Sequence, residues 1–256
     1  MQDYQPAADL LKDRIILVTG AGDGIGRAVA RRLGAHGATV ILLGRTIRKL
    51  EQVYDELEKA DAPKPAIYPM NLEGATPKDY NELARVIEGE FGRLDGLLHN
   101  AALFQGLTPI ANYDIELWYR ILQVNLNAPF LLTQALLGVL NRSADASVVF
   151  TADRVSEEGQ AYWGVYAVAK GGAQTLMKML ASELETNTPI RVNSIDPGRV
   201  RTPMTLKIYP GREPDQWPTP ETVLEPYLYL LGPDSKGVTG QTLHAQSWDP
   251  SVPVTV

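Results

Sequence analysis

The stretch Arg14-Ile15-Ile16-Leu17-Val18-Thr19-Gly20-Ala21-Gly22-Asp23-Gly24-Ile25-Gly26 leads from an apolar run into a glycine-rich turn. The apolar run predicts a buried strand up to Thr19, and the residues from Gly24 to His36 predict the helix that follows. Glycines let the chain turn tightly and let a phosphate approach the backbone, while a helix N-terminus offers free N–H groups and positive partial charge. The stretch is therefore typical of a strand–turn–helix unit that binds a phosphate, although a plain tight connection has the same sequence pattern.

The same alternation of apolar runs and helical segments continues along the chain. Further strands are predicted at 38–43, 66–70, 94–99, 146–150, 190–195 and 241–245, and further helices at 47–60, 77–91, 115–140, 162–185 and 220–231. Strands that are apolar throughout and alternate with helices indicate a parallel sheet covered on both faces. We therefore predict a single α/β domain over residues 1–256, a Rossmann-type doubly wound parallel sheet of about seven strands, with residues 1–12 as an N-terminal extension.

Composition excludes several classes of function. The 256 residues are 45% hydrophobic, which suffices for a sizeable core, and the net charge of −6 argues against nucleic acid or an anionic membrane as a partner. No cysteine is present, so disulfides, thiolate catalysis and cysteine-bound zinc are excluded, and the scattered histidines predict no metal site. Since the chain has neither an apolar run long enough to cross a bilayer nor a signal peptide, we expect a cytoplasmic protein.

Tyr166 and Lys170 lie one turn apart on the same face of the helix predicted at 162–185. An ammonium group beside a phenol lowers the pKa of the phenol, because the opposite charge favours its ionised form. This makes Tyr166 a candidate proton donor or acceptor near neutral pH. Asp153 stands thirteen residues before Tyr166, just after the strand predicted at 146–150.

The residues after the second predicted strand bear on the choice of dinucleotide. In a dinucleotide-binding unit, an acid at this place accepts a hydrogen bond from the adenosine 2′-hydroxyl and favours NAD. Here the residues are Gly44-Arg45-Thr46, without an acid, and Arg45 can pair with a 2′-phosphate. NADP(H) is therefore favoured and NAD(H) stays open, since Arg45 could also be a solvated residue at the start of a helix.

With these motifs in order, the chain resembles the short-chain dehydrogenase/reductase family from Arg14 to about Ala245. The turn up to Gly26 matches the family's T-G-x-x-x-G-x-G motif, and Asn125 matches its helix asparagine. Tyr166 and Lys170 match its catalytic pair. The resemblance implies cofactor contacts, besides those of Arg45, Tyr166 and Lys170, from Gly20, Gly22, Asp23, Gly24, Ile25, Gly26, Asn71, Leu72, Asn100, Ala101, Ala102, Pro197, Gly198, Val200 and Thr202.

The resemblance also implies a function. Members of the family are NAD(P)-dependent oxidoreductases that transfer hydride to or from a small-molecule substrate. In this chain Tyr166 would be the acid or base, Lys170 would lower the pKa of Tyr166 and hold the ribose, and Asn125 would hold a water for the proton relay. Homo-oligomers built on two long helices are common in the family, so a dimer or tetramer is expected.

Asp153 departs from the family pattern, which places a serine at this distance before the tyrosine; Thr151 and Ser156 are two and three residues away. An ionised Asp153 would repel charge that develops on a carbonyl oxygen and would raise the pKa of Tyr166. Three readings follow. The protein is a carbonyl or alcohol oxidoreductase in which Thr151, Ser156 or a water replaces the hydroxyl; or Asp153 acts with Tyr166 and Lys170 as in the family's pteridine reductases; or the site binds NADP(H) without turnover.

Segment 202–220 breaks the alternation because it is rich in proline, so no regular helix is predicted there. It is either a lid over the substrate or a surface loop with buried aromatic residues. Arg154, Arg199 and Arg201 flank the predicted cleft, where they either steer an anionic substrate or are merely solvated. His99, at the end of an apolar strand, is predicted to be structural.

Overall fold

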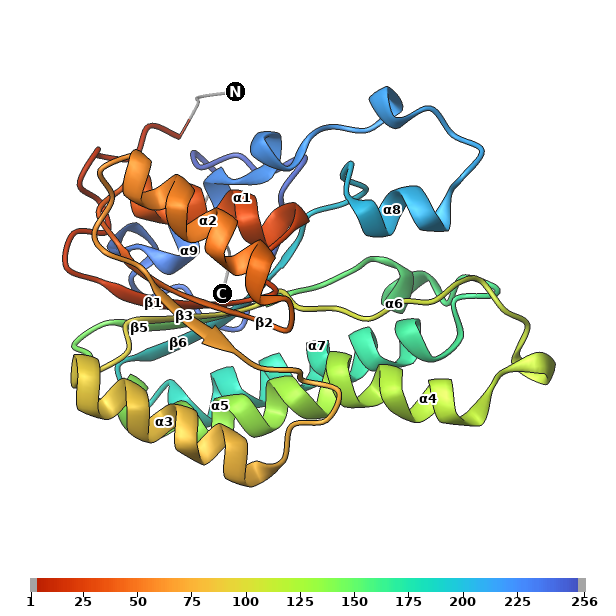
Figure 1. The fold of residues 1–256 in the computed structure, drawn as a ribbon, viewed down its shortest axis with the longest axis horizontal. Coiled ribbons are helices and arrows are strands. Elements are labelled where there is room, and N and C mark those ends of the chain that lie inside the picture. The colour runs from red at the N-terminus through yellow and green to blue at the C-terminus, as the bar shows by residue number, and fades with distance from the viewer. Residues whose placement is uncertain (1–3, 253–256) are drawn as a thin grey trace.

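The structure is a computed structural model that describes residues 4–252, and a parallel sheet lies at its centre (Figure 1). The strands of this sheet are β1 (Ile15–Thr19), β2 (Thr39–Gly44), β3 (Ala66–Pro69), β4 (Gly96–His99), β5 (Ala146–Thr151), β6 (Ile190–Asp196) and β7 (Thr242–His244). Their order is β3-β2-β1-β4-β5-β6-β7, and every neighbouring pair is parallel. The predicted doubly wound sheet is confirmed, and the direction of winding changes between β1 and β4.

Helices cover both faces of the sheet (Figure 1). One layer contains α1 (Gly24–Ala35), α2 (Ile47–Lys59) and α9 (Glu225–Leu231), and the other contains α3 (Pro77–Phe91), α5 (Ala128–Leu140) and α7 (Gly164–Leu184). Beyond the carboxyl edge of the sheet lie α4 (Ile115–Leu122), α6 (Val155–Glu158) and α8 (Pro203–Ile208). Short 3-10 turns are η1 (Ile110–Asn112), η3 (Pro214–Gln216), η4 (Pro220–Val223) and η5 (Pro233–Ser235). No helix within 4–252 is long and apolar enough to cross a membrane.

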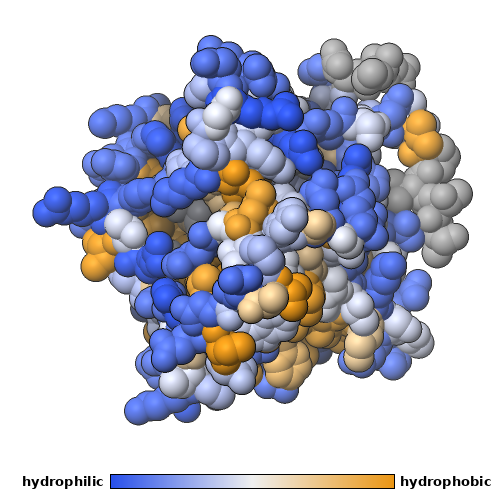
Figure 2. Space-filling model, turned by 90° about the vertical axis from the view of Figure 1, so that its right-hand side faces the viewer, coloured by the Kyte–Doolittle hydropathy of each residue, from blue (hydrophilic) through white to orange (hydrophobic). Residues whose placement is uncertain are grey.

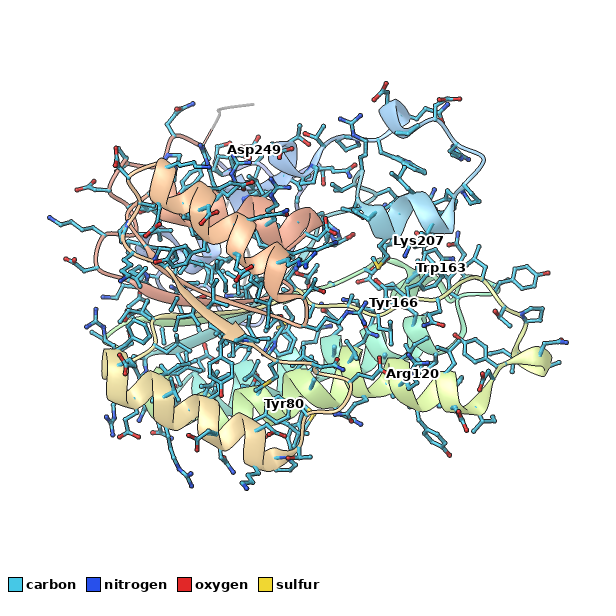
Figure 3. All side chains as sticks on the ribbon, in the orientation of Figure 1. Tyr80, Arg120, Trp163, Tyr166, Lys207 and Asp249 are labelled. Atoms are coloured by element: carbon cyan, nitrogen blue, oxygen red, sulfur yellow. The ribbon has the colours of Figure 1, made fainter. Side chains whose placement is uncertain are left out.

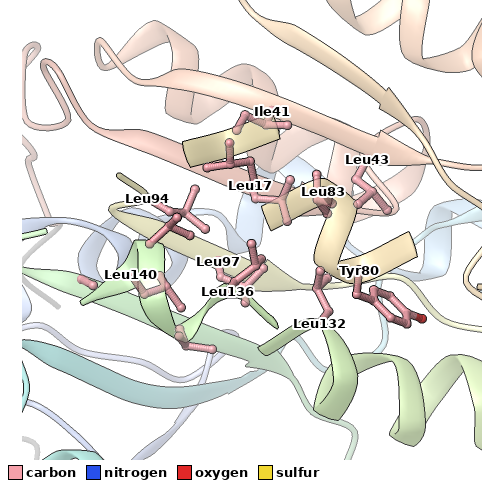
Figure 4. Close-up of a cluster of buried hydrophobic side chains, with 14 of the residues drawn as sticks. Leu17, Ile41, Leu43, Tyr80, Leu83, Leu94, Leu97, Leu132, Leu136 and Leu140 are labelled. Atoms are coloured by element: carbon pink, nitrogen blue, oxygen red, sulfur yellow. The ribbon is translucent and has the colours of Figure 1, made fainter. Parts of the chain in front are cut away.

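Alternate residues of each strand supply the cores on the two faces of the sheet. Leu17 and Leu97 belong to the cluster under α3 and α5, whereas Ile16 and Leu98 belong to the cluster under α1 and α2. Figure 4 shows the first cluster, in which leucines of the strands pack against leucines of the helices. Successive side chains of a strand point to opposite faces, so most positions of a strand between two helix layers are apolar. The exceptions include Ser147 and Asn193, which are buried and hydrogen-bonded to backbone carbonyls.

Prolines explain where the structure departs from the predicted helices. The helix predicted at 115–140 is interrupted by a π-helical turn, η2 (Gln123–Asn127), just before Pro129, whose ring cannot donate a hydrogen bond and would collide with a carbonyl in a regular helix. The helix predicted at 220–231 is divided into η4 and α9, and Pro226 lies in the first turn of α9. In segment 202–220, the prediction of no helix is wrong for α8, because Pro203 stands at its first position, where its missing N–H costs nothing.

Candidate active site

One cleft of about 730 Å³ opens at the carboxyl edge of the sheet, where the winding changes direction. Ligands of open α/β sheets bind at this place. All the residues predicted to contact a cofactor line the cleft, except Gly26, which is buried behind it. Figure 2 looks at the end of the molecule that carries α6 and α8, where apolar patches lie within a hydrophilic surround.

The glycine turn forms a cradle between β1 and α1. Gly20 and Gly24 have φ of +67° and +50°, a backbone region that other residues rarely adopt. A Cβ on Gly26 would lie 2.3 Å from the carbonyl oxygen of Gly20, so no larger residue fits there. Asp23 caps the helix by accepting a hydrogen bond of 2.8 Å from Gly24 N. The turn thus leaves the backbone open to a phosphate at the helix N-terminus.

Tyr166, Asp153 and Lys170 meet at the other end of the cleft. The hydroxyl of Tyr166, on α7, donates a hydrogen bond of 3.1 Å to Asp153 Oδ2, which follows β5. Lys170, one turn further along α7, places its Nζ 5.7 Å from the centroid of the Tyr166 ring and donates at 2.7 Å to the carbonyl of Thr151. Tyr166 and Lys170 are buried, with 2% and 6% of their surface exposed. The predicted catalytic pair and Asp153 therefore lie together, with a hydrogen bond joining Tyr166 to Asp153 and with Lys170 bonded to the backbone of Thr151.

Burial is the main cause of the pKa shifts of Tyr166, Asp153 and Lys170. It raises the pKa of Tyr166 well above its usual value, and the charge and hydrogen bond of Asp153 raise it further. Burial also raises the pKa of Asp153, although hydrogen bonding and the charge of Lys170 oppose it, and burial lowers the pKa of Lys170. The prediction that the pKa of Tyr166 is lowered is therefore wrong for this structure, since burial and Asp153 raise it. The predicted opposing effect of Asp153 is confirmed.

Asn125 lies in the π-helical turn η2 and is buried, with 3% of its surface exposed. Its amide Nδ2 donates to the carbonyls of Leu103 and Ile121, at 2.9 Å and 2.8 Å, and its Oδ1 accepts from Leu103 N at 3.2 Å. The side chain thus ties the loop after β4 to the helix below Tyr166. Its role in holding a relay water stays a prediction.

The sequence did not predict the contacts that Asp196, His244 and Lys49 make in the cleft. Asp196, at the end of β6, accepts a hydrogen bond of 2.9 Å from Gly198 N, and its Oδ2 lies 3.2 Å from His244 Nδ1 and 3.7 Å from Arg154 Nε. Lys49, on α2, pairs with Asp23. No spacing rule points to His244, Lys49 or this use of Asp196, because each partner comes from a different element.

Aromatic side chains form the wall of the cleft beside Tyr166. The ring centroids of Phe104 and Trp163 lie 5.3 Å and 5.7 Å from that of Tyr166. In Figure 3, Lys207 of α8 lies above Trp163 and Tyr166, and all three line the cleft. Trp217, in segment 202–220, is buried against Tyr209, with ring centroids 5.5 Å apart. This segment therefore contributes both cleft-lining and buried residues.

The charged residues and histidines predicted near the cleft differ in their contacts. Arg201 pairs with Asp215 and Arg154 approaches Asp196, whereas the Arg199 guanidinium lies 5.2 Å from the Tyr209 ring centroid. His99 is buried, with a ring nitrogen 2.7 Å from Thr133 Oγ1, which fits the predicted structural role. Within residues 4–252, no group of three or more acids or histidines is placed to hold a metal ion.

Comparison with known proteins defines the family. Residues 14–213 match the short chain dehydrogenase family. The chain is 43% identical to uncharacterized oxidoreductase YciK of Escherichia coli (strain K12), over 95% of this chain and 96% of that protein. A solved structure described as a short chain dehydrogenase from Pseudomonas syringae has a TM-score of 0.94 and 50% identity, and covers 96% of this chain and 100% of its own. Another, from Shigella flexneri 2a and complexed with NADP, has a TM-score of 0.91 and 42% identity, over 94% and 100% of the two chains. The chain belongs to the short chain dehydrogenase family and is an oxidoreductase.

Proposed function

We propose that this oxidoreductase uses NADP(H) and transfers hydride to or from a small carbonyl or alcohol substrate, with Tyr166 as the acid or base. The observation that carries the proposal is the hydrogen bond of 3.1 Å between the Tyr166 hydroxyl and Asp153, in the same cleft as the glycine turn. Hydride transfer from a dinucleotide requires a phosphate cradle and a proton-transfer group on one surface. Both are present here.

The residues of the cleft fit a phosphorylated dinucleotide. The pyrophosphate would lie against Gly20, Gly24 and the first turn of α1, where the positive φ angles and missing side chains leave room. Arg45 is exposed after β2 and would hold the adenosine 2′-phosphate. The Shigella flexneri relative complexed with NADP supports the same cofactor. Tyr166 and Lys170 would face the nicotinamide riboside.

Proton transfer would then proceed through Tyr166. When bound, NADPH supplies a hydride that the carbonyl carbon accepts, and the two electrons of the C=O π bond move to the oxygen. The oxygen takes the proton from the Tyr166 hydroxyl, which completes the alcohol. The Lys170 ammonium, 5.7 Å from the ring centroid, stabilises the phenolate that remains. In the reverse direction the phenolate removes the proton from the alcohol.

Asp153 would act as a carboxylic acid when the substrate is bound. Burial raises its pKa, which favours the protonated form, and a protonated carboxyl can donate a hydrogen bond to the substrate oxygen. That is the contact that a serine hydroxyl makes at this place in the family. An ionised Asp153 would instead repel the negative charge that develops on the oxygen.

Reduction of a C=N bond in a pterin is a second candidate. The carboxyl of Asp153 could accept from a pterin amino group or donate to a ring nitrogen while Tyr166 supplies a proton. Phe104 and Trp163, packed beside the Tyr166 ring, offer a flat apolar wall for such a ring. Both contacts favour a planar substrate that carries hydrogen-bonding groups at its edge.

The test measures NADPH oxidation by the wild type and by Asp153→Ser, with a panel of ketones and aldehydes and with dihydropterins. Carbonyl turnover by the wild type that is kept in Asp153→Ser supports the first proposal, whereas carbonyl turnover that appears only in Asp153→Ser contradicts it for the natural protein. Pterin turnover that is lost in Asp153→Ser supports the second. NADPH binding without hydride transfer to any substrate of either panel contradicts both and indicates a cofactor-binding protein without turnover.

We also propose that segment 202–220 closes over the substrate and that the chain forms a dimer or tetramer through α5 and α7. Lys207 and Tyr209 of that segment line the cleft. Phe130 on α5 and Val168 and Met179 on α7 are 44%, 54% and 55% exposed, so both helices offer apolar side chains that a partner subunit could cover. Slower proteolysis of the segment with NADPH and substrate would support the lid, and a lower mass for Met179→Lys in light scattering would support the oligomer.

A further inference from the structure

We infer that Lys49 is a second cation of the site for the adenosine 2′-phosphate and that it contributes to a preference for NADPH over NADH. The inference rests on the proposed use of NADP(H). It adds a residue from α2 that lies outside the glycine turn and outside the residues that directly follow β2.

The placement of Lys49 is specific. It stands in the first turn of α2 and lines the cleft together with Arg45. A Cβ on Gly22 would lie 2.9 Å from Lys49 Cβ, so the base of the lysine side chain packs where only glycine leaves room. Its ammonium pairs with the carboxylate of Asp23. A side chain that is 49% exposed is thus held at both ends over the phosphate-binding turn.

Asp23 explains how the Lys49 ammonium is held beside the glycine turn. Its Oδ1 caps α1 by accepting from Gly24 N at 2.8 Å, and its Oδ2 pairs with Lys49. Burial would raise the pKa of Asp23, but the hydrogen bonds from Lys49 and Gly24 N outweigh it and lower the pKa, so the carboxylate is ionised. The ionised carboxylate therefore holds the Lys49 ammonium at the edge of the glycine turn, where a ligand phosphate can take the place of Asp23 as its partner.

At this end of the cleft, Arg45 and Lys49 are the two cations placed to contact a phosphate. Glu73 lines the cleft, but it accepts a hydrogen bond of 2.7 Å from Arg120. Among residues 4–252, no ion pair joins Arg45 to an acid. Arg48 is exposed on the same turn of α2 but does not line the cleft. A dianionic 2′-phosphate would therefore meet Arg45 directly and would compete with Asp23 for Lys49.

The test compares Lys49→Met with Arg48→Met, which removes the neighbouring charge outside the cleft. Methionine keeps the apolar stem that packs on Gly22 and removes only the ammonium. Titration calorimetry should show NADPH binding roughly tenfold weaker in Lys49→Met, as expected for one charged hydrogen bond, with NADH binding within about twofold. Arg48→Met should leave both affinities unchanged. Binding of adenosine 2′,5′-bisphosphate to Lys49→Met should be weakened as much as binding of NADPH, whereas binding of 5′-AMP should not be weakened.

Asp23→Asn provides the complementary variant, because asparagine still caps the helix but no longer holds the lysine by charge. NADPH should bind a few-fold more tightly to it. Equal weakening of NADPH and NADH in Lys49→Met, or no weakening of either, overturns the inference. Failure of the proposed cofactor use looks different: the wild type would then show no preference for NADPH, and Arg45→Ala would change neither affinity.

Discussion

Charged side chains gather at both ends of the sheet, and the two groups differ in how they are paired. At the amino end, Asp145 accepts from Arg14 Nη1 and from Arg191 Nε, each at 3.0 Å, just before β5. The carboxylate of Asp95, just before β4, accepts from Ile15 N at 2.8 Å. The backbone carbonyls of Asp95 and Asp145 both accept hydrogen bonds from Arg14. Asp145 is paired with arginines at the starts of β1 and β6, and Asp95 is paired with Arg93, two residues before it. Such a network fixes how the strands align.

At the carboxyl end, buried groups lie close together without cancelling one another. Burial raises the pKa of Asp153 and of Tyr166 and lowers the pKa of Lys170, so each group is moved away from its ordinary protonation equilibrium. The same three groups face a cleft that a ligand can enter. The comparison teaches that charges at the amino end are matched by partners, whereas the groups at the carboxyl end have shifted pKa values of the kind that cluster at functional sites.

The largest effect is expected from Tyr166→Phe at the carboxyl end. It removes the proposed acid, so turnover should fall by about 10²–10⁴-fold, the usual contribution of a general acid. The free energy of unfolding should change by no more than about 1.5 kcal/mol, the value of one hydrogen bond. Steady-state kinetics and urea unfolding of the same preparation measure both. Turnover close to that of the wild type would remove Tyr166 from the mechanism.

At the amino end, Asp145→Ala should lower the stability and leave the chemistry intact. Removing one partner of this partly buried ion network should cost about 3 kcal/mol, the low end of the range for buried pairs, because Arg14 and Arg191 both lose the carboxylate of Asp145. Urea unfolding measures this loss, and the folded fraction should keep the wild-type kcat. Glu82→Ala is the control, since Glu82 pairs with Arg85 at a side chain that is 57% exposed and lies on α3, away from the cleft, and it should change neither quantity. A stable Asp145→Ala would contradict the structural role of the network.

His99 gives a pH dependence of stability. Burial and, less strongly, the charge of Lys170 lower the pKa of His99 from 6.5 to about 3. Between these values the unfolded chain binds a proton that the folded chain does not, so stability is complete above about pH 6.5 and is lost as the pH falls. The loss should reach about 2 kcal/mol by pH 5. Urea unfolding above about pH 6.5 and at pH 5 gives the loss of the free energy of unfolding between the two conditions. This loss should be smaller for His99→Gln than for the wild type, and an equal loss would exclude His99 as the cause.

The smallest effect is expected from Asp196→Asn. Asparagine can still accept from Gly198 N but loses the charge that faces Arg154 and His244. That charge contributes to the raised pKa of Tyr166, so its removal should move the pH profile of turnover to lower pH. The maximal rate should change only a few-fold, since the turn after β6 keeps its hydrogen bond. An unchanged profile would show that Asp196 acts only on the backbone.

Much of the fold could be predicted because helices and strands depend on residues close in sequence. The apolar runs of β1 and β2 and the glycine turn could be predicted from short stretches of sequence. The π turn before Pro129 and the helix that begins at Pro203 were missed, because the effect of a proline depends on its position in the turn. The candidate site could also be predicted locally, because Tyr166 and Lys170 are four residues apart on one helix.

By itself, the sequence determined the doubly wound class, the phosphate cradle and the pairing of Tyr166 with Lys170, because each depends on spacing along one or two elements. Only the tertiary structure decided the upward shift of the pKa of Tyr166. It also decided that Lys49 stands over Asp23 and that Asp145 joins two arginines. These features depend on burial and on groups brought together from distant segments, and such electrostatic effects are absent from the spacing of residues in the chain.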